Sequence, residues 1–443
     1  MTTSLNQFVK PVTTKVNEKG NLEIGGCDLL DLAKEYKTPL YVIDEETLRG
    51  ICEDYKKAFS SYEKVKFMYA SKALCTSAIT KIVESEGFGF DVVSGGELYT
   101  AYKAGVDMKK VLFNGNNKTL EELELAIECN VGHISVDNFY ELSLLDKVSK
   151  EKNKTTDIFL RVTPGIECHT HEYIQTGNLD SKFGFDLSQV DEAVNLIQNE
   201  YKNLNLRGLH AHIGSQIFET QVYYDEINIL IKELVRIEKE HGILLDEINI
   251  GGGLGVKYTA NDVPPSTHKI AEVIIESVKK SCEELKVDYP TIYLEPGRSV
   301  ISTSGVTLYT VGSQKYVPNV DKTYVSVDGG MADNPRPSMY QAEYEVQVVN
   351  KPNEECLRKV TIAGRFCESG DILIKDVDLP KLNAGDVLCI FNTGAYNYSM
   401  ASNYNRVQKP AMVLVNSGHS AIIVKRETRD DLLRYDVIPD RLK

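Results

Sequence analysis

The residues with the clearest chemical potential in this chain are one lysine and three short segments downstream of it. Lys72 follows an apolar run at residues 65–69 that is typical of a buried strand. An amine at the edge of an apolar scaffold is desolvated, which favours its neutral form, and a neutral amine attacks carbonyl carbons. The later segments are His210-Ala211-His212-Ile213-Gly214-Ser215, Gly251-Gly252-Gly253-Leu254-Gly255 and Glu295-Pro296-Gly297-Arg298. Together they offer what an aldehyde-phosphate cofactor on the lysine would need.

The glycine run at residues 251–253 suits an anion. Because Gly251, Gly252 and Gly253 have no side chains, backbone N–H groups can approach a phosphate closely there. The alternative is an ordinary tight turn. The position of the run, directly after a predicted strand, favours the phosphate site.

Glu295 and Arg298 flank a proline–glycine turn. A carboxylate can hold the protonated nitrogen of a pyridine ring, and a pyridinium ring accepts electrons from a carbanion. The alternative for Glu295 is a surface acid at a strand end. The turn brings Arg298 close to the same place, where its guanidinium can bind a phosphate or a carboxylate through two hydrogen bonds.

Two histidine pairs have a spacing that metal ligands can have. His210 and His212 alternate on a predicted strand and therefore face the same side, and His169 and His171 have the same spacing. Neither pair has an evident third ligand, so no metal is predicted. A His212 ring stacked on a flat cofactor ring, with Ser215 donating to the phosphate, fits the segment better.

Cys367 lies in the acidic segment Cys367-Glu368-Ser369-Gly370-Asp371. An isolated cysteine is usually an inert core residue. A thiol in this setting can instead return a proton to a carbanion, provided that it reaches the mouth of a barrel.

The elements that must position these residues alternate between short apolar runs and amphipathic stretches. Strands that alternate with helices pair in parallel, and strands without polar alternation are buried on both faces. About eight such units predict a (β/α)8 TIM barrel, which we assign to residues 38–305. The predicted strands are 65–69, 88–92, 111–113, 133–136, 158–162, 206–213, 247–250 and 292–294, and the clearest helices are 120–129, 190–199, 224–240 and 270–285.

The candidate residues share one end of this predicted barrel. Lys72 follows the first strand, and Asp91 ends the second. His212 ends the sixth strand, the glycine run follows the seventh, and Glu295 follows the eighth. Active sites of such barrels lie at the C-terminal ends of the strands, whereas unrelated positions would be divided between the two ends.

The pattern changes after residue 305. Alternating strand patterns without helices predict an antiparallel β-sandwich or β-barrel domain over residues 306–443. The N-terminal segment 1–37, with a strand-like run at 21–24, is predicted to pack with this domain. The predicted strands are 323–327, 343–348, 357–363, 387–391, 411–415 and 421–424.

Composition excludes several classes of protein. A net charge of −14 argues against broad nucleic-acid binding, which needs a basic surface. No apolar stretch approaches the roughly 20 residues that span a bilayer, and the N-terminus lacks the pattern of a secretion signal. The nine cysteines are scattered and never form a Cys-x-x-Cys pair, which predicts reduced thiols in a cytoplasm.

Taken together, the segments resemble the PLP-dependent amino-acid decarboxylases of the alanine-racemase fold type, fold type III, which act on ornithine, diaminopimelate or arginine. Two motifs, Ser181-Lys182-Phe183-Gly184 and Ser399-Met400-Ala401-Ser402-Asn403-Tyr404-Asn405, are similar to the diaminopimelate branch in particular. The other resembling motifs are Tyr69-Ala70-Ser71-Lys72-Ala73, Asp91-Val92-Val93-Ser94-Gly95-Gly96-Glu97-Leu98, Leu160-Arg161-Val162-Thr163-Pro164-Gly165, Thr176-Gly177, His212-Ile213-Gly214-Ser215, Gly251-Gly252-Gly253-Leu254-Gly255, Glu295-Pro296-Gly297-Arg298, Cys367-Glu368-Ser369-Gly370-Asp371 and Gly394-Ala395-Tyr396.

This resemblance implies a role for each candidate residue. Lys72 would bind pyridoxal 5′-phosphate (PLP) through a Schiff base, His212 would stack on the ring, and Glu295 would hold the ring nitrogen. Cys367 would protonate the carbanion from across a homodimer interface, so that each site is shared by two chains. The other cofactor residues would be Asp91, Ser215, Gly251, Gly252, Gly253, Pro296, Gly297, Arg298 and Tyr396, and the substrate residues would be Arg298, Arg336, Tyr340, Glu368 and Tyr396.

The implied reaction is the decarboxylation of meso-2,6-diaminopimelate to L-lysine and CO2, the last step of lysine biosynthesis. Ornithine, arginine and carboxynorspermidine are the alternative substrates. Ornithine has no distal carboxylate, whereas Glu368 together with an arginine suits both distal charges of diaminopimelate. A racemase is disfavoured because Glu295 stands where racemases of this fold have an arginine. A non-catalytic binding protein is disfavoured because the lysine and the glycine run are intact.

Overall fold

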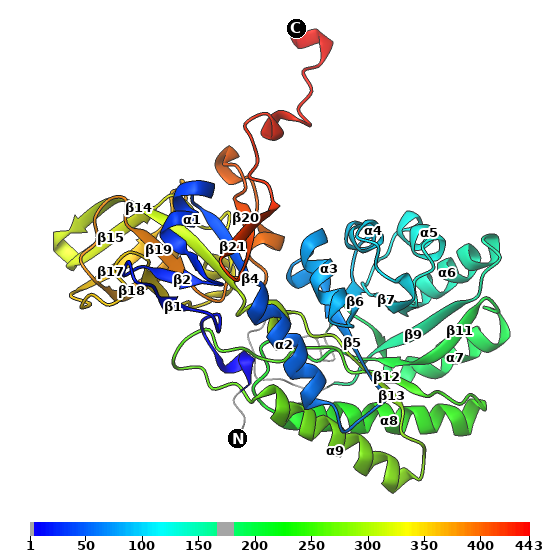
Figure 1. Cartoon of the computed structure of the whole chain (residues 1–443). Helices are drawn as coiled ribbons and strands as arrows, with labels where there is room; N and C mark the ends of the chain where they lie inside the picture. Colours follow the sequence, from blue (N-terminus) through cyan, green and yellow to red (C-terminus); the bar gives the residue numbers. More distant parts are fainter. Residues whose placement is uncertain (1–3, 166–180) are drawn as a thin grey trace. The chain divides into compact units, whose positions relative to one another are not determined.

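The computed structural model describes residues 4–165 and 181–443, and it divides the chain into two compact units. The barrel unit comprises residues Met1–Gln7, Arg49–Lys257 and Val263–Val300, and the β unit comprises Phe8–Leu48, Tyr258–Asp262 and Ile301–Lys443 (Figure 1). The expected boundary at residue 38 is corrected by this division, because β4 (Leu40–Asp44) pairs with strands of the β unit.

The barrel unit is a closed parallel barrel, as predicted. In the described residues, eight parallel strands follow one another around the barrel, and pairing between β8 and β9 closes it. A two-residue strand, β10 (Phe185–Asp186), adds to β9. The eight strands are β5 (Val65–Ala70), β6 (Gly89–Val92), β7 (Val111–Phe113), β8 (His133–Val136), β9 (Thr156–Thr163), β11 (Leu204–His210), β12 (Glu247–Asn249) and β13 (Thr291–Leu294).

Burial on both faces explains why these short runs form strands. Every residue of β6, β7 and β12 is buried, and Met68, Leu112, Phe159 and Tyr293 form an apolar cluster contributed by four different strands. Amphipathic helices surround the strands, as Figure 1 shows. They are α2 (Glu45–Ala58), α3 (Ser77–Ser85), α4 (Gly95–Lys103), α5 (Leu120–Glu128), α6 (Phe139–Glu151), α7 (Val190–Asn199), α8 (Gln221–His241) and α9 (Thr267–Leu285).

Helix starts are marked by capping side chains. The Thr119 hydroxyl accepts a hydrogen bond from the N–H of Glu122, and the Glu122 carboxylate accepts one from the backbone N–H of Thr119, which is a complete capping box at the start of α5. Thr76, Ser94 and Asn138 cap α3, α4 and α6 in the same way with their side-chain oxygens. Each cap directly follows the loop after a barrel strand, so it also fixes where that loop ends.

A buried ion pair joins the loop after β7 to helix α6. The Lys118 ammonium donates to the Glu141 carboxylate (2.6 Å) and to the carbonyl oxygens of Gly115 (2.8 Å) and Ser135 (2.7 Å). Both side chains are almost fully buried, at 1% and 3% exposure. Burial raises the pKa of Glu141 to about 7, although Lys118 opposes that rise. The loop after β7 is thereby held against β8 and α6.

We expect Lys118→Met to destabilise the barrel unit by about 3–5 kcal/mol, because it leaves Glu141 buried without its partner. The double variant Lys118→Met/Glu141→Leu should recover most of that loss, since it removes both charges. Urea unfolding followed by circular dichroism measures the difference. A single variant as stable as the parent would show that the pair contributes nothing to the barrel.

The β unit is a mixed sheet built from both ends of the chain. Its strand order is β18-β17-β15-β14-β4-β20-β21, and β19 pairs with β14 and β16. A separate three-stranded sheet contains β1 (Lys15–Val16), β2 (Leu22–Ile24) and β3 (Cys27–Asp28). The remaining strands are β14 (Gly305–Val317), β15 (Lys322–Val327), β16 (Val346–Val348), β17 (Arg358–Ala363), β18 (Ile372–Leu379), β19 (Val387–Ile390), β20 (Ala411–Asn416) and β21 (His419–Val424).

The prediction of a purely antiparallel domain is corrected at two pairings. Strands β4 and β20 are parallel, as are β15 and β17. Parallel neighbours need a long connection, and both pairs have one: the whole barrel separates β4 from β20, and β16 intervenes between β15 and β17. The predicted strand at 343–348 forms only over Val346–Val348, and β14 and β18 were not predicted.

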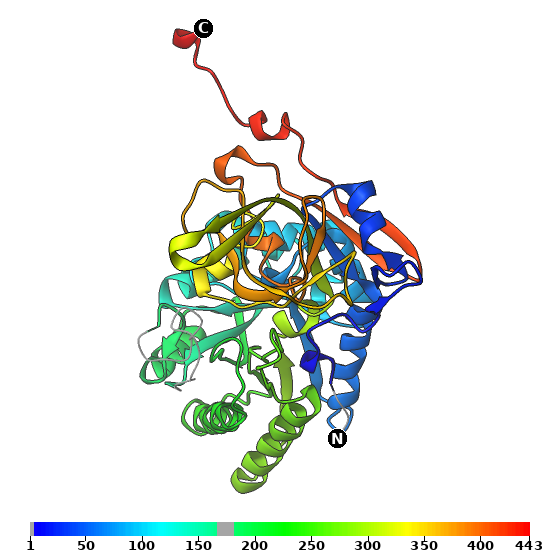
Figure 2. The ribbon, with the colours of Figure 1, turned by 90° about the vertical axis from the view of Figure 1, so that its left-hand side faces the viewer.

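The core of the β unit joins residues from the two ends of the sequence. Leu22, Ile24 and Leu29 share one apolar cluster with Val306, Val387 and Val413. Helix α1 (Leu29–Tyr36) lies beside β20 and β21 (Figures 1 and 2), where Tyr36 and Ser420 hydrogen-bond through their hydroxyls (3.0 Å). The N-terminal segment is therefore an integral part of this unit.

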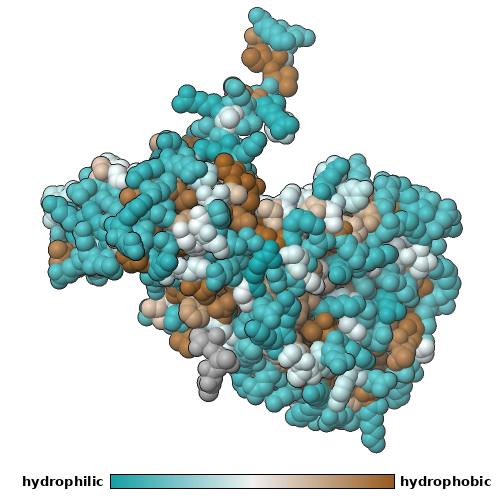
Figure 3. Space-filling view, viewed as in Figure 1, coloured by the Kyte–Doolittle hydropathy of each residue, from teal (hydrophilic) through white to brown (hydrophobic). Residues whose placement is uncertain are grey.

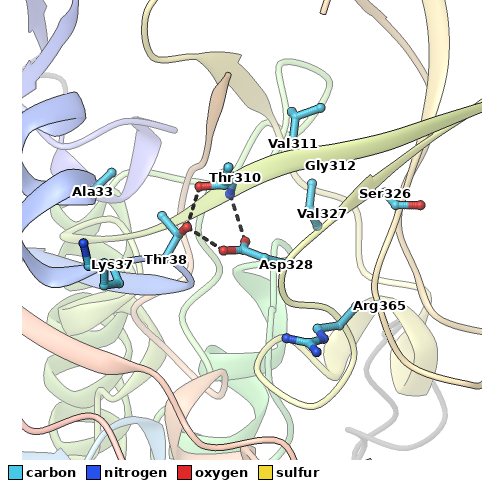
Figure 4. Close-up of a pocket in the computed structure, with 10 residues that line it drawn as sticks. All are labelled: Ala33, Lys37, Thr38, Thr310, Val311, Gly312, Ser326, Val327, Asp328 and Arg365. Carbon is cyan, nitrogen blue, oxygen red and sulfur yellow. Dashed lines mark hydrogen bonds between the residues drawn. The ribbon is translucent and has the colours of Figure 1, made fainter. Parts of the chain in front are cut away.

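The β unit has two further surface features. The C-terminal segment exposes large apolar side chains, including Tyr435 (83%) and Val437 (85%), and brown atoms mark this segment in Figure 3. A surface pocket of about 520 Å³ has Lys37 and Arg365 on its wall, and Asp328 accepts one hydrogen bond there from the Thr38 hydroxyl and one from the backbone N–H of Thr310 (Figure 4). Among the described residues, no helix has the length and apolar character needed to cross a bilayer.

Candidate active site

The structure places Lys72 beside a fully buried acid. Lys72 lies in a short 3-10 turn, Ser71–Ala73, directly after β5, and its side chain is 37% exposed. Its Nζ is 3.6 Å from Oδ2 of Asp91, whose side chain is completely buried in β6. The amine therefore stands at the C-terminal end of the barrel strands, half out of solvent and next to a carboxylate.

Glu295 follows β13 on the same end and is held by two amides. The side-chain nitrogens of Asn114 (2.9 Å) and Asn249 (2.7 Å) both donate to its Oε1. Asn114 also donates to Oδ1 of Asp91 (2.6 Å), so one amide bridges the two carboxylates. The second carboxylate oxygen, Oε2, lies 3.6 Å from Nε2 of His210, which is longer than a hydrogen bond.

The two carboxylates titrate as a pair with opposite tendencies. Burial raises the pKa of Asp91 to about 7, and the neighbouring Glu295 adds to that rise while Lys72 and Asn114 oppose it. Burial alone would also raise the pKa of Glu295, but attraction to His210 and Lys72 outweighs it and holds this pKa below its ordinary value. Glu295 is therefore the ionised member of the pair at neutral pH.

The two histidines have separate environments. Strand β11 ends at His210, so the predicted strand to residue 213 is too long, and His212 lies in the loop that follows. His210 is buried, with Nδ1 2.8 Å from the Ser135 hydroxyl. Burial lowers the pKa of His210 and holds that of His212 well below its ordinary range, so His212 is a neutral, flat ring.

The glycine run is packed too closely for side chains. A Cβ on Gly252 would lie 2.1 Å from the carbonyl oxygen of Glu295, and Gly253 has a φ of 97° that L-residues rarely adopt. The N–H of Gly251 donates to Asn249 Oδ1 (2.8 Å), and that of Gly252 donates to His212 Nδ1 (3.3 Å). The run therefore ties the loop after β12 to its neighbours.

Arg298 and Ser215 are brought together as the sequence suggested. The Arg298 guanidinium donates to the Ser215 hydroxyl oxygen from Nη2 (2.9 Å) and Nε (3.3 Å). Arg298 begins the short helix α10 (Arg298–Ile301) after Pro296 and Gly297, and it is 8% exposed. A guanidinium and a hydroxyl held side by side suit the binding of a phosphate.

In the β unit, Arg336 is the centre of a polar and aromatic cluster. It begins α11 (Arg336–Tyr340) and is 7% exposed. Its guanidinium donates to the Tyr344 hydroxyl (2.6 Å) and lies 4.8 Å from the centre of the Tyr258 ring. Tyr396 follows a buried strand end and has a φ of 61°. These contacts hold the Arg336 guanidinium in one orientation. None of the ion pairs among the described residues joins Arg336 to a carboxylate.

Cys367 is exposed rather than buried, so the alternative of an inert core thiol does not apply. Its backbone N–H donates to the Asn405 side chain (2.9 Å), and the neighbouring Glu368 accepts a 3.3 Å hydrogen bond from the Tyr404 hydroxyl. The acidic segment is thereby attached to the 399–405 motif. The other histidine pair considered, His169 and His171, lies outside the described residues.

Sequence reasoning missed several residues that contact candidate site residues, among them Asn114, Asn249, Tyr258 and Tyr344. Asn114 and Asn249 give no motif signal, although both stand at the C-terminal ends of predicted strands, where the barrel places functional groups. Tyr258 contacts Arg336 because the chain returns to the β unit at residues 258–262, which no local pattern indicates, whereas Tyr344 is only eight residues from Arg336 in the sequence.

Comparison with known proteins defines the class. The family model described as pyridoxal-dependent decarboxylase, pyridoxal binding domain, matches residues 46–302. The match includes Lys72, Asp91 and Glu295 and covers more than half of the chain. A Synechocystis diaminopimelate decarboxylase is 48% identical, with 99% of this chain and 95% of the relative covered. A Bacillus subtilis diaminopimelate decarboxylase is also 48% identical, with coverage of 96% and 97%. The chain belongs to the diaminopimelate decarboxylases of the pyridoxal-dependent decarboxylase family.

Solved structures agree with this membership. The diaminopimelate decarboxylase of M. jannaschii, solved in complex with L-lysine, is 37% identical and superposes with a TM-score of 0.92, covering 98% of this chain and 100% of that one. A lysine/ornithine decarboxylase from Vibrio vulnificus, complexed with putrescine, is 21% identical with a TM-score of 0.75. The second likeness shows the fold alone.

Proposed function

We propose that this chain decarboxylates meso-2,6-diaminopimelate to L-lysine and CO2, the last step of lysine biosynthesis, with PLP as its cofactor. The observation that carries the proposal is the joint position of Lys72, Asp91 and an ionised Glu295 at the C-terminal end of the barrel. The 48% identity to named diaminopimelate decarboxylases supports the choice of reaction.

The barrel residues fit PLP at three places. Lys72 has the amine that would bind the aldehyde, Glu295 has the carboxylate that would hold the ring nitrogen, and Arg298 with Ser215 has the donors for the phosphate. Among the described residues, the buried atoms Asp91 Oδ2 and His210 Nε2 have no hydrogen-bond partner, which is typical of a polar site that receives a ligand. The further cofactor residues would be Gly251, Gly252, Gly253, Pro296, Gly297 and Tyr396.

Once bound, PLP supplies a ring that accepts the electron pair released when CO2 leaves. The chain's own residues prepare for that step. An ionised Glu295 keeps a proton on the ring nitrogen that it holds, and the neutral His212 ring offers a flat face without adding charge. Asp91, beside Lys72, can take up or release a proton near neutral pH.

The β unit supplies the groups that we assign to the substrate. Diaminopimelate has a distal ammonium and a distal carboxylate, so its site needs an acid together with an arginine. Glu368 and Arg336 are that pair in our proposal, with Tyr340, Tyr396 and Arg298 as further substrate residues. The buried and oriented guanidinium of Arg336 is suited to a carboxylate.

We further propose a cytoplasmic homodimer in which each site is completed by the second chain. The exposure of Cys367 supports this arrangement, because a proton donor for a partner's site must lie on the surface of its own chain. The eight described cysteines are all free, which supports a reducing compartment.

We expect Cys367→Ala to slow turnover by about 10- to 100-fold, because the carbanion then depends on solvent for its proton. Product analysis in deuterium oxide would also detect a loss of stereochemical control at the protonated carbon. The exposed Cys356→Ala is the matched control and should behave as the parent. Unchanged kinetics and product for the Cys367 variant would remove this thiol from the mechanism.

The test of the whole proposal is direct. The purified chain is given PLP with meso-diaminopimelate, ornithine, arginine or carboxynorspermidine in parallel, and L-lysine, amines and CO2 are measured. L-Lysine from diaminopimelate alone is the expected result. An amine formed from another substrate would support the proposed mechanism but refute the proposed substrate. If PLP is bound and no substrate gives a product, the proposed reaction is refuted.

A further inference from the structure

We propose that Asn114 and Asn249 are positioning residues that hold the three cofactor-binding parts of the barrel in register: the lysine, the acid for the ring nitrogen, and the glycine loop. The inference rests on the proposed binding of PLP. Neither asparagine belongs to the predicted set of site residues, and neither needs to touch the cofactor to act.

The evidence is one continuous chain of polar contacts between residues on or directly after five barrel strands, β5, β6, β7, β12 and β13. Lys72 Nζ lies 3.6 Å from Asp91, and Asp91 accepts a hydrogen bond from Asn114 (2.6 Å). The same Asn114 nitrogen donates to Glu295 (2.9 Å), and Glu295 accepts a second hydrogen bond from Asn249 (2.7 Å). Asn249 then accepts from the backbone N–H of Gly251 (2.8 Å). The chain therefore begins at the amine and ends at the glycine run.

The burial of these groups makes the contacts consequential. Asn114 is 3% exposed and Asn249 is 0% exposed, so water does not compete for their hydrogen bonds. Both amides donate to the same oxygen, Oε1 of Glu295, which leaves Oε2 as the oxygen that can face a ring nitrogen. An amide suits this task because it donates to a carboxylate without ever carrying a charge itself.

Asn114 has the more demanding position, since it bridges Glu295 and Asp91. Two buried carboxylates that share one site repel each other, which favours protonation of one of them. Donation from a neutral amide to both reduces this repulsion and lets Glu295 stay ionised. Asn249 instead couples the orientation of Glu295 to the loop after β12. Its side-chain nitrogen donates to Glu295, and its side-chain oxygen accepts from the backbone N–H of Gly251.

The test uses Asn114→Asp and Asn249→Asp, which keep the side-chain size but place a carboxylate against Glu295. We expect each variant of the full chain to bind PLP about 10- to 100-fold more weakly, since a hydrogen bond to a buried charge is lost and a repulsion is added. The absorbance of bound PLP should also change with pH at a different midpoint from the parent. With diaminopimelate, kcat should fall while KM changes little, because neither residue is assigned to the substrate.

A control variant and two leucine variants keep the inference testable. Asn138→Asp is the matched control: Asn138 caps α6 with its side-chain oxygen, which aspartate preserves, and it has no contact with Glu295. If an aspartate variant fails to fold, Asn114→Leu or Asn249→Leu removes the donors without adding a charge. Thermal melting establishes which variants are folded.

Folded Asn114 and Asn249 variants that match the parent in PLP affinity and in the pH midpoint of the absorbance would overturn the inference. These two readouts do not depend on the substrate. A chain that binds PLP but decarboxylates something other than diaminopimelate would therefore refute the proposed reaction and leave the positioning role intact.

Discussion

Lys72→Ala is expected to lower kcat by more than about 1,000-fold while leaving the fold unchanged, because it removes the only amine assigned to the cofactor aldehyde. The side chain is 37% exposed and lies after the end of β5, outside the apolar core. Its loss should therefore change the free energy of unfolding by less than about 1 kcal/mol. L-Lysine production measures the first effect, and thermal melting measures the second.

Lys66→Ala is the control for this experiment. Lys66 belongs to the same strand but lies towards its N-terminal end, where it donates to the Tyr293 hydroxyl (2.6 Å). Its removal should leave turnover close to that of the parent. An unfolded Lys72 variant would contradict the placement of this residue at the edge of the barrel, and an active one would exclude it from catalysis.

Glu295→Gln should lower kcat by about 100- to 1,000-fold, because a neutral amide cannot hold a proton on the ring nitrogen. The side chains are nearly isosteric, so the barrel should remain folded. Glu295 is 5% exposed, and both asparagine amides donate to its Oε1. The carbonyl oxygen of a glutamine can take the place of Oε1 and accept both hydrogen bonds. Single-turnover kinetics with PLP in excess separate this chemical effect from weaker cofactor binding.

Glu226→Gln provides the matched control for Glu295→Gln. Glu226 is another fully buried acid of the barrel unit, on α8, and burial raises its pKa well above its ordinary value. Burial favours the neutral form of this acid, and Glu226 has no assigned role, so a neutral amide should change kcat by less than about twofold. Equal losses for the two variants would mean that any buried glutamine impairs this barrel and would remove the special role of Glu295.

The barrel was predictable because its information is local. Most of the strands are short apolar runs whose residues are largely buried, so runs such as 111–113 and 133–136 coincide with β7 and β8. The C-terminal position of Lys72 and Glu295 follows from the same pattern, since a barrel places all strand ends on one side. The end of β11 was less predictable, because the residues after His210 remain buried although they leave the strand.

The rest depended on contacts between distant segments. The parallel pair β4 and β20 brings residues 40–44 beside residues 411–416, and no local pattern states that partner. The same holds for Asn114 and Asn249, whose importance lies in meeting one carboxylate from different strands. Tyr258 could not be linked to Arg336 from sequence. Residues 258–262 lie between two segments of the barrel unit in the sequence, yet in the structure they belong to the β unit.

The pairing of β4 with β20 has a consequence for synthesis on the ribosome. All eight barrel strands have been synthesised once residue 294 is made, well before the C-terminal part of the β unit, so the barrel unit can fold early. Strand β4 is made before any of them, yet its neighbours β14 and β20 begin only at Gly305 and Ala411. Its hydrogen-bonding edges therefore stay unpaired through most of translation, and such edges invite aggregation. Chains that stop before residue 411 should contain a folded barrel attached to an incomplete sheet, and we expect them to need chaperones that the full chain does not.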